Sequence, residues 1–175
     1  MAGRTPQEAL NTFVHPLQRA LSTVSDGILL TSGVRNPPAL HMLRLAQPTQ
    51  RLHASEVLAM SFVCDYQVLE TRESGGAWSV RGLGYRCELR DAEHEILAYH
   101  WHPFALGDVV FPHLHLSAGS SVANVHLTRA HLPTGLVHLE DVLRLVIDAF
   151  DVQPLRPDRE EVLRSAKAAS LAVWV

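Results

Sequence analysis

Apolar residues near the start of the chain recur at helical spacing and predict an amphipathic helix. Residues 5–8 have the side chains of a capping box, and Pro6 stands at the first helical position, where a missing N–H costs nothing. The apolar stripe consists of Leu10, Phe13, Val14, Leu17, Leu21 and Val24. Pro16 lies inside this stripe, and we expect it to kink the helix or split it after His15, because proline removes a backbone hydrogen bond.

Residues 25–54 have a weaker pattern. Residues 28–30 are consistent with a short strand, and residues 36–38 with a turn or extended spacer. Residues 40–45 fit either a strand or a short helix. No internal repeat and no linker-like segment divides the chain, so we expect a single domain that covers residues 1–175.

From residue 56 onward, apolar and polar residues alternate with a period of two, which is typical of strands with one buried face. The first such strand covers residues 58–68 and has its even-numbered residues on the core face. Residues 78–89 form a second strand with Leu83, Tyr85, Cys87 and Leu89 on the apolar face and Gly82, Gly84, Arg86 and Glu88 on the other. Residues 90–93 connect it to a third strand at 96–102, so we expect an antiparallel meander.

Eight of the eleven histidines lie between residues 94 and 138. Those in the third strand and in the next two predicted strands all oppose the apolar residues of their own strand. Because consecutive antiparallel strands are usually neighbours, we expect these histidines to share one sheet face with Arg86 and Glu88. The set is His100, His102, His113, His115 and His126. The other three, His94, His131 and His138, are predicted to lie in turns or at the start of a helix.

Two further helices are predicted near the C-terminus. Residues 139–150 carry an apolar stripe with Glu140, Asp141, Arg144 and Asp148 on the outer face, and Asp158 begins the second helix. The tail at 171–175 is too apolar to remain in water, and we expect it to dock as a strand or against a partner subunit in a homo-oligomer. These elements predict an α+β fold with a mostly antiparallel sheet of five or six strands and helices on one face.

The composition is that of a globular protein, with 47% hydrophobic and 19% charged residues. A net charge of −3 with scattered basic residues gives no overall attraction for nucleic acid, so contact with RNA would need a local patch. Cys64 and Cys87 lack Cys-x-x-Cys spacing and indicate a reducing compartment. The chain has no leader and no long apolar run, so we expect a cytoplasmic protein without membrane association.

The histidine face suits two kinds of chemistry. Imidazole titrates near neutral pH, so two histidines can act as acid and base while Arg86 stabilises an anionic transition state, as in metal-independent RNA cleavage. Alternatively, the two His-x-His triplets can hold a divalent metal such as Zn with an open position for hydrolysis. The metal candidates are His100 or His102, His113, His115 and His126. Glu88 and Asp65 are candidates for a general base or a carboxylate ligand.

A third interpretation involves no catalysis, because imidazoles on a half-exposed face can simply bond to one another or to water. The chain would then be a binding or assembly module. Residues 131–135 are predicted to form a loop before a helix, from which His131 or Thr134 could reach a ligand. The sequence has no P-loop, no Gly-x-Ser-x-Gly elbow and no His-Glu-x-x-His helix.

Three segments follow one another along the chain: Tyr99-His100-Trp101, Phe111-Pro112-His113-Leu114-His115, and the predicted helix that begins Leu139-Glu140-Asp141-Val142-Leu143. Over residues 95–150 the chain resembles the TumE-like toxins of bacterial toxin–antitoxin pairs. The resemblance implies a small α+β ribonuclease that is toxic through an RNA target and is neutralised by an antitoxin partner. The matched positions are His100, His113 and His115.

Overall fold

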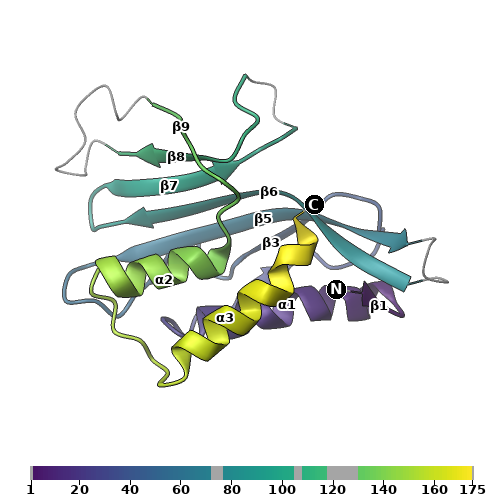
Figure 1. Cartoon of the computed structure of the whole chain (residues 1–175), viewed down its shortest axis with the longest axis horizontal. Coiled ribbons are helices and arrows are strands. Elements are labelled where there is room, and N and C mark those ends of the chain that lie inside the picture. The colour runs from purple at the N-terminus through teal and green to yellow at the C-terminus, as the bar shows by residue number, and fades with distance from the viewer. Residues whose placement is uncertain (1, 72–76, 105–107, 118–129, 175) are drawn as a thin grey trace.

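The computed structural model describes residues 2–71, 77–104, 108–117 and 130–174 (Figure 1). Its helices are α1 (Pro6–Leu21), α2 (Leu139–Ala149), α3 (Arg159–Ser170) and the short 3-10 helix η3 (Leu171–Val173). Its strands are β1 (Ala2–Gly3), β2 (Leu29–Thr31), β3 (His41–Leu45), β4 (Gln50–Arg51), β5 (Ala59–Thr71), β6 (Ala77–Arg90), β7 (Glu95–Trp101), β8 (His113–Leu116) and β9 (Leu132–Pro133). None of the described helices combines the length and apolarity needed to cross a membrane.

The described strands form one antiparallel sheet in the order β2-β3-β5-β6-β7-β8-β9, with β1 paired to β6 and β4 to β5. Figure 1 shows the helices gathered on one side of this sheet. The prediction of an α+β fold with a mostly antiparallel sheet is confirmed. The described part contains nine strands rather than five or six, because two-residue strands such as β1, β4 and β9 are too short to show a period.

A single hydrophobic core joins the helices to one face of the sheet. The even-numbered residues of β5 from Met60 to Val68 are buried, as their alternation predicts, whereas Glu70 near the end of the strand is exposed. The ring of Tyr66 packs against Phe13 of α1 at 5.9 Å. On α2 and α3, the buried residues include Leu143 and Leu163. Since the helices cover this face alone in Figure 1, the odd-numbered residues of β5 lie on the opposite, open face.

The predicted alternation of β6 is correct in its second half only. The register shifts between Asp65 and Tyr66, where Asp65 pairs with Gly84 and Tyr66 with Gly82. Leu83 is therefore the extra residue of a β-bulge rather than a regular member of the apolar face. Before the bulge it is Val80 and Gly82 that face the core. A bulge exchanges the two faces beyond it, and the hydrophobic pattern alone does not reveal one.

Helix α1 is not split at Pro16, contrary to one of the two expected outcomes. It runs from Pro6 to Leu21, and Glu8 N–H donates to the Thr5 hydroxyl at the N-cap, as the capping box predicts. Phe13 and Leu17 on either side of the proline are buried in the core. Packing of this face against the sheet compensates for the missing hydrogen bond, because most helical stability in proteins comes from tertiary contacts.

The apolar tail docks on its own chain, and it does so as a 3-10 turn rather than as the predicted strand. Val173 is buried, and the indole of Trp174 lies against Gly82 of β6. The Trp174 ring is 5.6 Å from that of Tyr85 and 5.9 Å from that of Trp101. Aromatic contacts within the chain therefore cover this tryptophan, and a homo-oligomer through the tail stays a prediction.

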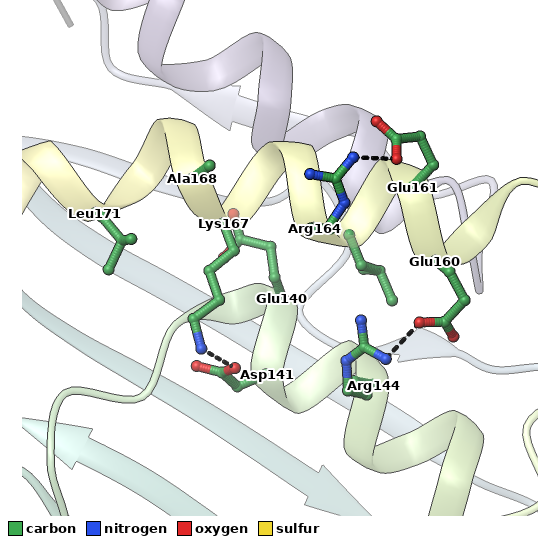
Figure 2. A pocket seen from close by; sticks show the side chains of 10 residues that line it. Glu140, Asp141, Arg144, Glu160, Glu161, Arg164, Lys167, Ala168 and Leu171 are labelled. Carbon is green, nitrogen blue, oxygen red and sulfur yellow. Dashed lines mark hydrogen bonds and ion pairs between the residues drawn. The ribbon is translucent and has the colours of Figure 1, made fainter.

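Glu140 was predicted on the outer face of its helix, and this prediction is wrong. The residue is only 2% exposed, because α3 packs over the start of α2. Glu140 lines a cavity of about 540 Å³ between the two helices. Figure 2 shows the lining side chains, with ion pairs that include Lys167–Asp141 and Arg144–Glu160. Neither carboxylate oxygen has a hydrogen-bond partner among the described residues. Burial raises the pKa of Glu140 to about 6.

The tight contact at Gly82 leads to a first prediction. A Cβ at this position would lie 2.3 Å from the Trp174 ring, so we expect Gly82→Ala to lower the free energy of unfolding by about 1–3 kcal/mol. Gly135→Ala is the control, because a Cβ there meets no atom within 4 Å. Urea unfolding monitored by circular dichroism measures both. Equal effects of the two substitutions, or an undiminished Gly82→Ala effect in a Trp174→Ala background, would contradict the contact.

The buried carboxyl of Glu140 leads to a second prediction. Its pKa in the folded chain, about 6, exceeds the ordinary value of 4.5, so ionisation destabilises the fold above pH 6, and this cost disappears as pH falls to 4.5. Glu140→Gln should therefore raise the free energy of unfolding at neutral pH by up to about 2 kcal/mol. The gain should fade on acidification. Urea unfolding between pH 4.5 and neutral pH measures this gain, with Glu70→Gln at an exposed position as the control. A difference between Glu140→Gln and the original chain that does not change with pH would contradict the prediction.

Candidate functional site

The register of β6, β7 and β8 determines which polar residues meet on the open face. Arg86 pairs with His100, and His100 pairs with His113 on the next strand. His115 stands opposite Ala98, whose own partner on β6 is Glu88. In an antiparallel sheet directly paired residues point to the same side. The structure thus brings the predicted residues Arg86, Glu88, His100, His113 and His115 together on one face.

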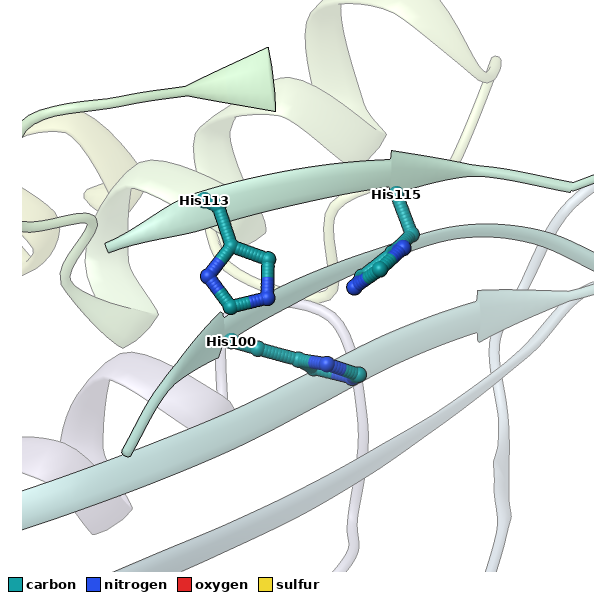
Figure 3. A group of neighbouring side chains, drawn as sticks. All are labelled: His100, His113 and His115. Atoms are coloured by element: carbon teal, nitrogen blue, oxygen red, sulfur yellow. The ribbon is translucent and has the colours of Figure 1, made fainter. Parts of the chain in front are cut away.

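His100, His113 and His115 form a compact trio, and Figure 3 shows their rings pointing toward one another. The ring centroids are separated by 5.6 Å for His100–His113, 4.9 Å for His100–His115 and 4.8 Å for His113–His115. One ring nitrogen from each residue lies within 4.8 Å of the other two. His113 is buried, whereas the other two are half-buried.

Hydrogen bonding orients the ring of His113. His113 Nδ1 lies 2.8 Å from the carbonyl oxygen of Phe111, and because a carbonyl can only accept, Nδ1 carries the proton. The lone pair of a neutral His113 is therefore on Nε2. His100 Nε2 is buried and has no hydrogen-bond partner among the residues that the structure describes. Both features leave imidazole nitrogens available for a ligand.

The site favours neutral imidazoles. Burial, followed by the charges of His115 and Arg86, lowers the pKa of His100 to about 4. Burial also lowers the pKa of His102 and of His115 below the ordinary value of 6.5. These side chains are uncharged at neutral pH, which is the form in which histidine binds a metal ion.

His131 joins the cluster, although the sequence predicts a turn for it. Its ring is 5.0 Å from that of His113 and 4.5 Å from that of His115. His113 pairs with Pro133 and Leu114 with Leu132, so the same register continued by one residue sets His131 beside His115. A two-residue strand gives no periodic signal, so the sequence indicates His131 only as a loop residue that could reach a ligand. The pairing of β9 with β8 is what places it beside the trio.

His102 lies next to the trio rather than within it. Its ring centroid is 5.6 Å from that of His100, at the end of β7. The carboxylate of Asp65 is close enough to counteract the lowering of the His102 pKa. Gly84 of β6 is the strand partner of Asp65. A Cβ at Gly84 would approach the Trp101 carbonyl oxygen, next to His102, to 2.7 Å. The fifth predicted histidine, His126, lies outside the described residues.

Two of the remaining histidines have the local roles that the sequence predicts. His138 is the N-cap of α2, and its backbone N–H donates to Asp141 at 3.2 Å. His94 lies in the turn after β6, where its backbone N–H donates to Asp91 at 2.7 Å. Neither belongs to the histidine trio.

Arg86 and Glu88 form an ion pair at the edge of the trio, and the Ser61 hydroxyl donates to Glu88 at 2.9 Å. Glu88 is thus engaged in holding the guanidinium beside the histidines. Its role as a general base stays a prediction, and it is not part of the metal-compatible group of described residues. The Arg86 side chain remains half-exposed.

No family model, curated protein or solved structure matches this chain. The resemblance to TumE-like toxins, with its RNA target and antitoxin partner, therefore stays a prediction. The geometry of the histidine face has to support any functional conclusion by itself.

The hydrogen bond of His113 leads to a third prediction. We expect its neutral ring to hold the proton on Nδ1, because the Phe111 carbonyl accepts it at 2.8 Å. Long-range ¹H–¹⁵N correlation NMR at about pH 8, where imidazole is neutral, distinguishes the two tautomers. A proton found on Nε2 would contradict this orientation and the availability of Nε2 as a ligand.

Proposed function

We propose that this chain is a metal-dependent hydrolase in which His100, His113 and His115 bind one Zn-type divalent ion. The observation that carries the proposal is the convergence of three imidazole nitrogens within 4.8 Å of one another. Three histidines are a ligand set of catalytic zinc sites, in which the fourth position stays open. The arrangement pairs one His-x-His strand, β8, with a single histidine from its neighbour, β7.

The dimensions of the trio are compatible with zinc. Imidazole nitrogens bind zinc at about 2.0–2.1 Å, so tetrahedral ligands lie roughly 3.4 Å apart. The nitrogens would have to approach by up to about 1.5 Å, which small rotations of half-buried side chains can supply. His113 is already held by the Phe111 carbonyl, an outer hydrogen bond typical of metal-binding histidines.

The surrounding residues suit hydrolysis. A zinc ion with three protein ligands makes a bound water acidic enough to attack a substrate near neutral pH. Arg86, paired across the strands with His100, would stabilise the negative charge that develops on the substrate. The Ser61 and Glu88 contacts keep this guanidinium in place before a substrate arrives.

A metal-independent ribonuclease is the second candidate, and the position of Arg86 beside the histidines favours it. Acid–base cleavage requires one imidazole to be protonated when it donates to the leaving group. The lowered pKa of His100 and His115 counts against these two in that role at neutral pH. The metal-dependent function therefore ranks first.

Metal analysis gives the fourth prediction. Untagged protein should bind about one zinc per chain, and His115→Ala or His100→Ala should reduce this stoichiometry below about 0.1, because a site with two ligands holds zinc far more weakly. His53→Ala is the control, since this exposed histidine lies away from the trio. Elemental analysis after dialysis measures the content. Wild-type protein that takes up no metal, or variants that retain it, would contradict the proposal.

An activity assay separates the two candidate functions. The zinc-loaded protein is tested on a carboxylic ester, a phosphodiester and single-stranded RNA, with and without a chelator. Hydrolysis that is lost with chelator and restored by zinc supports the metal-dependent function. RNA cleavage that survives chelation but is lost in His113→Ala would instead establish the ribonuclease.

A further inference from the structure

A groove of about 440 Å³ opens on the same sheet face as the histidines. Its floor is formed by Ser61 and Val63 of β5 and by residues of β6, and one wall by residues 47–49 between β3 and β4. Three arginines line it: Arg44, Arg86 and Arg90. Ligand pockets commonly have this size, and a concentration of guanidinium groups marks this one for an anion.

The groove leads directly to the histidine trio. Arg44 pairs with Val63, Val63 with Arg86, and Arg86 with His100, so these residues form one row across four strands. Neighbouring strands are about 4.8 Å apart, which places Arg86 one strand and Arg44 three strands from His100. Arg86 thus belongs to both the groove and the rim of the trio.

The charges in the groove leave donors available. Arg44 uses Nη1 to donate to the carbonyl oxygens of Leu45 at 3.0 Å and Ala46 at 3.3 Å, which fixes its position without neutralising it. Arg90 forms no ion pair with any described residue within 4.0 Å. Glu88 is the one acidic side chain in the lining described by the structure, and Glu95 beside it also interacts with Arg86 and Arg90, so three cations face two carboxylates.

We propose that this groove binds a phosphoryl group of the substrate, next to the centre that hydrolyses it. Guanidinium forks match phosphate oxygens bidentately, and a phosphoryl group offers enough oxygens for more than one arginine. The Ser61 hydroxyl adds a further polar group to the lining. That the bound molecule is a substrate rests on the proposed hydrolase function, whereas phosphate binding by the groove does not require a metal. The phosphoryl group can come from a mononucleotide or from a nucleic-acid strand.

Phosphate binding by the chelator-treated chain tests the proposal and is the fifth prediction. Inorganic phosphate is titrated while backbone ¹H–¹⁵N shifts are recorded, so that the metal centre does not contribute. Arg44→Gln and Arg90→Gln should each weaken binding about tenfold, because each removes a charged hydrogen-bond donor. Arg35→Gln is the matched control, since it removes the same charge from an exposed position outside the groove lining. Glu88→Gln should tighten binding, because it removes the competing carboxylate beside Arg86.

The outcomes are distinct. The proposal is overturned if phosphate does not saturate the wild-type chain, or if the Arg44 and Arg90 variants bind as Arg35→Gln does. AMP and a short single-stranded RNA are then added as competitors, and the tighter of the two identifies the source of the phosphoryl group. Displacement of phosphate by neither would also overturn it. Zinc content is measured on untreated portions of the same preparations, which keeps the two ideas separate. Zinc binding without phosphate binding refutes only the groove, and phosphate binding without zinc binding refutes only the metal centre.

Discussion

The antiparallel register of β6, β7 and β8 is the constraint on which the candidate site depends. Each strand places a polar residue on the open face at the same level, and the pairs Arg86–His100 and His100–His113 align them in one row. Because side chains alternate with a period of two, a slip of one residue would send these histidines into the helical layer and their apolar neighbours into water. Burial of one face by the helices therefore holds the other face in position.

Gathering imidazoles on a sheet has an electrostatic consequence. Partial burial, together with the mutual repulsion of the rings as cations, lowers the pKa of His100 to about 4 and also lowers the pKa of His115. Neutral rings can crowd to centroid distances below 5 Å, and they present lone pairs rather than protons. The same crowding opposes general-acid chemistry and is compatible with the metal ion that we propose, while Arg86 places positive charge at the rim of the trio.

The C-terminal tail packs against the side of the sheet that faces away from the histidines. Trp174 fits over Gly82 because that position carries no Cβ, and the bulge at Leu83 turns Gly82 toward the core. The contacts with Tyr85 and Trp101 connect the last residues to the strands that carry Arg86 and His100. The backbone of the histidine face is thus supported from behind by an aromatic cluster drawn from distant parts of the chain.

Local patterns were sufficient to determine the class of fold, the three main helices, the core face of β5 and the shared face of His100, His113, His115 and Arg86, because two- and 3.6-residue periods reflect one-sided burial. They were insufficient wherever a contact between distant segments decided the outcome. His131 joins the trio through β9, a strand too short to have a period, and Glu140 is buried because α3 covers it. The β6 bulge shifted Leu83, and packing kept α1 continuous through Pro16. In each case the observed conformation is stabilised by contacts between residues far apart in the sequence, which a local pattern cannot predict.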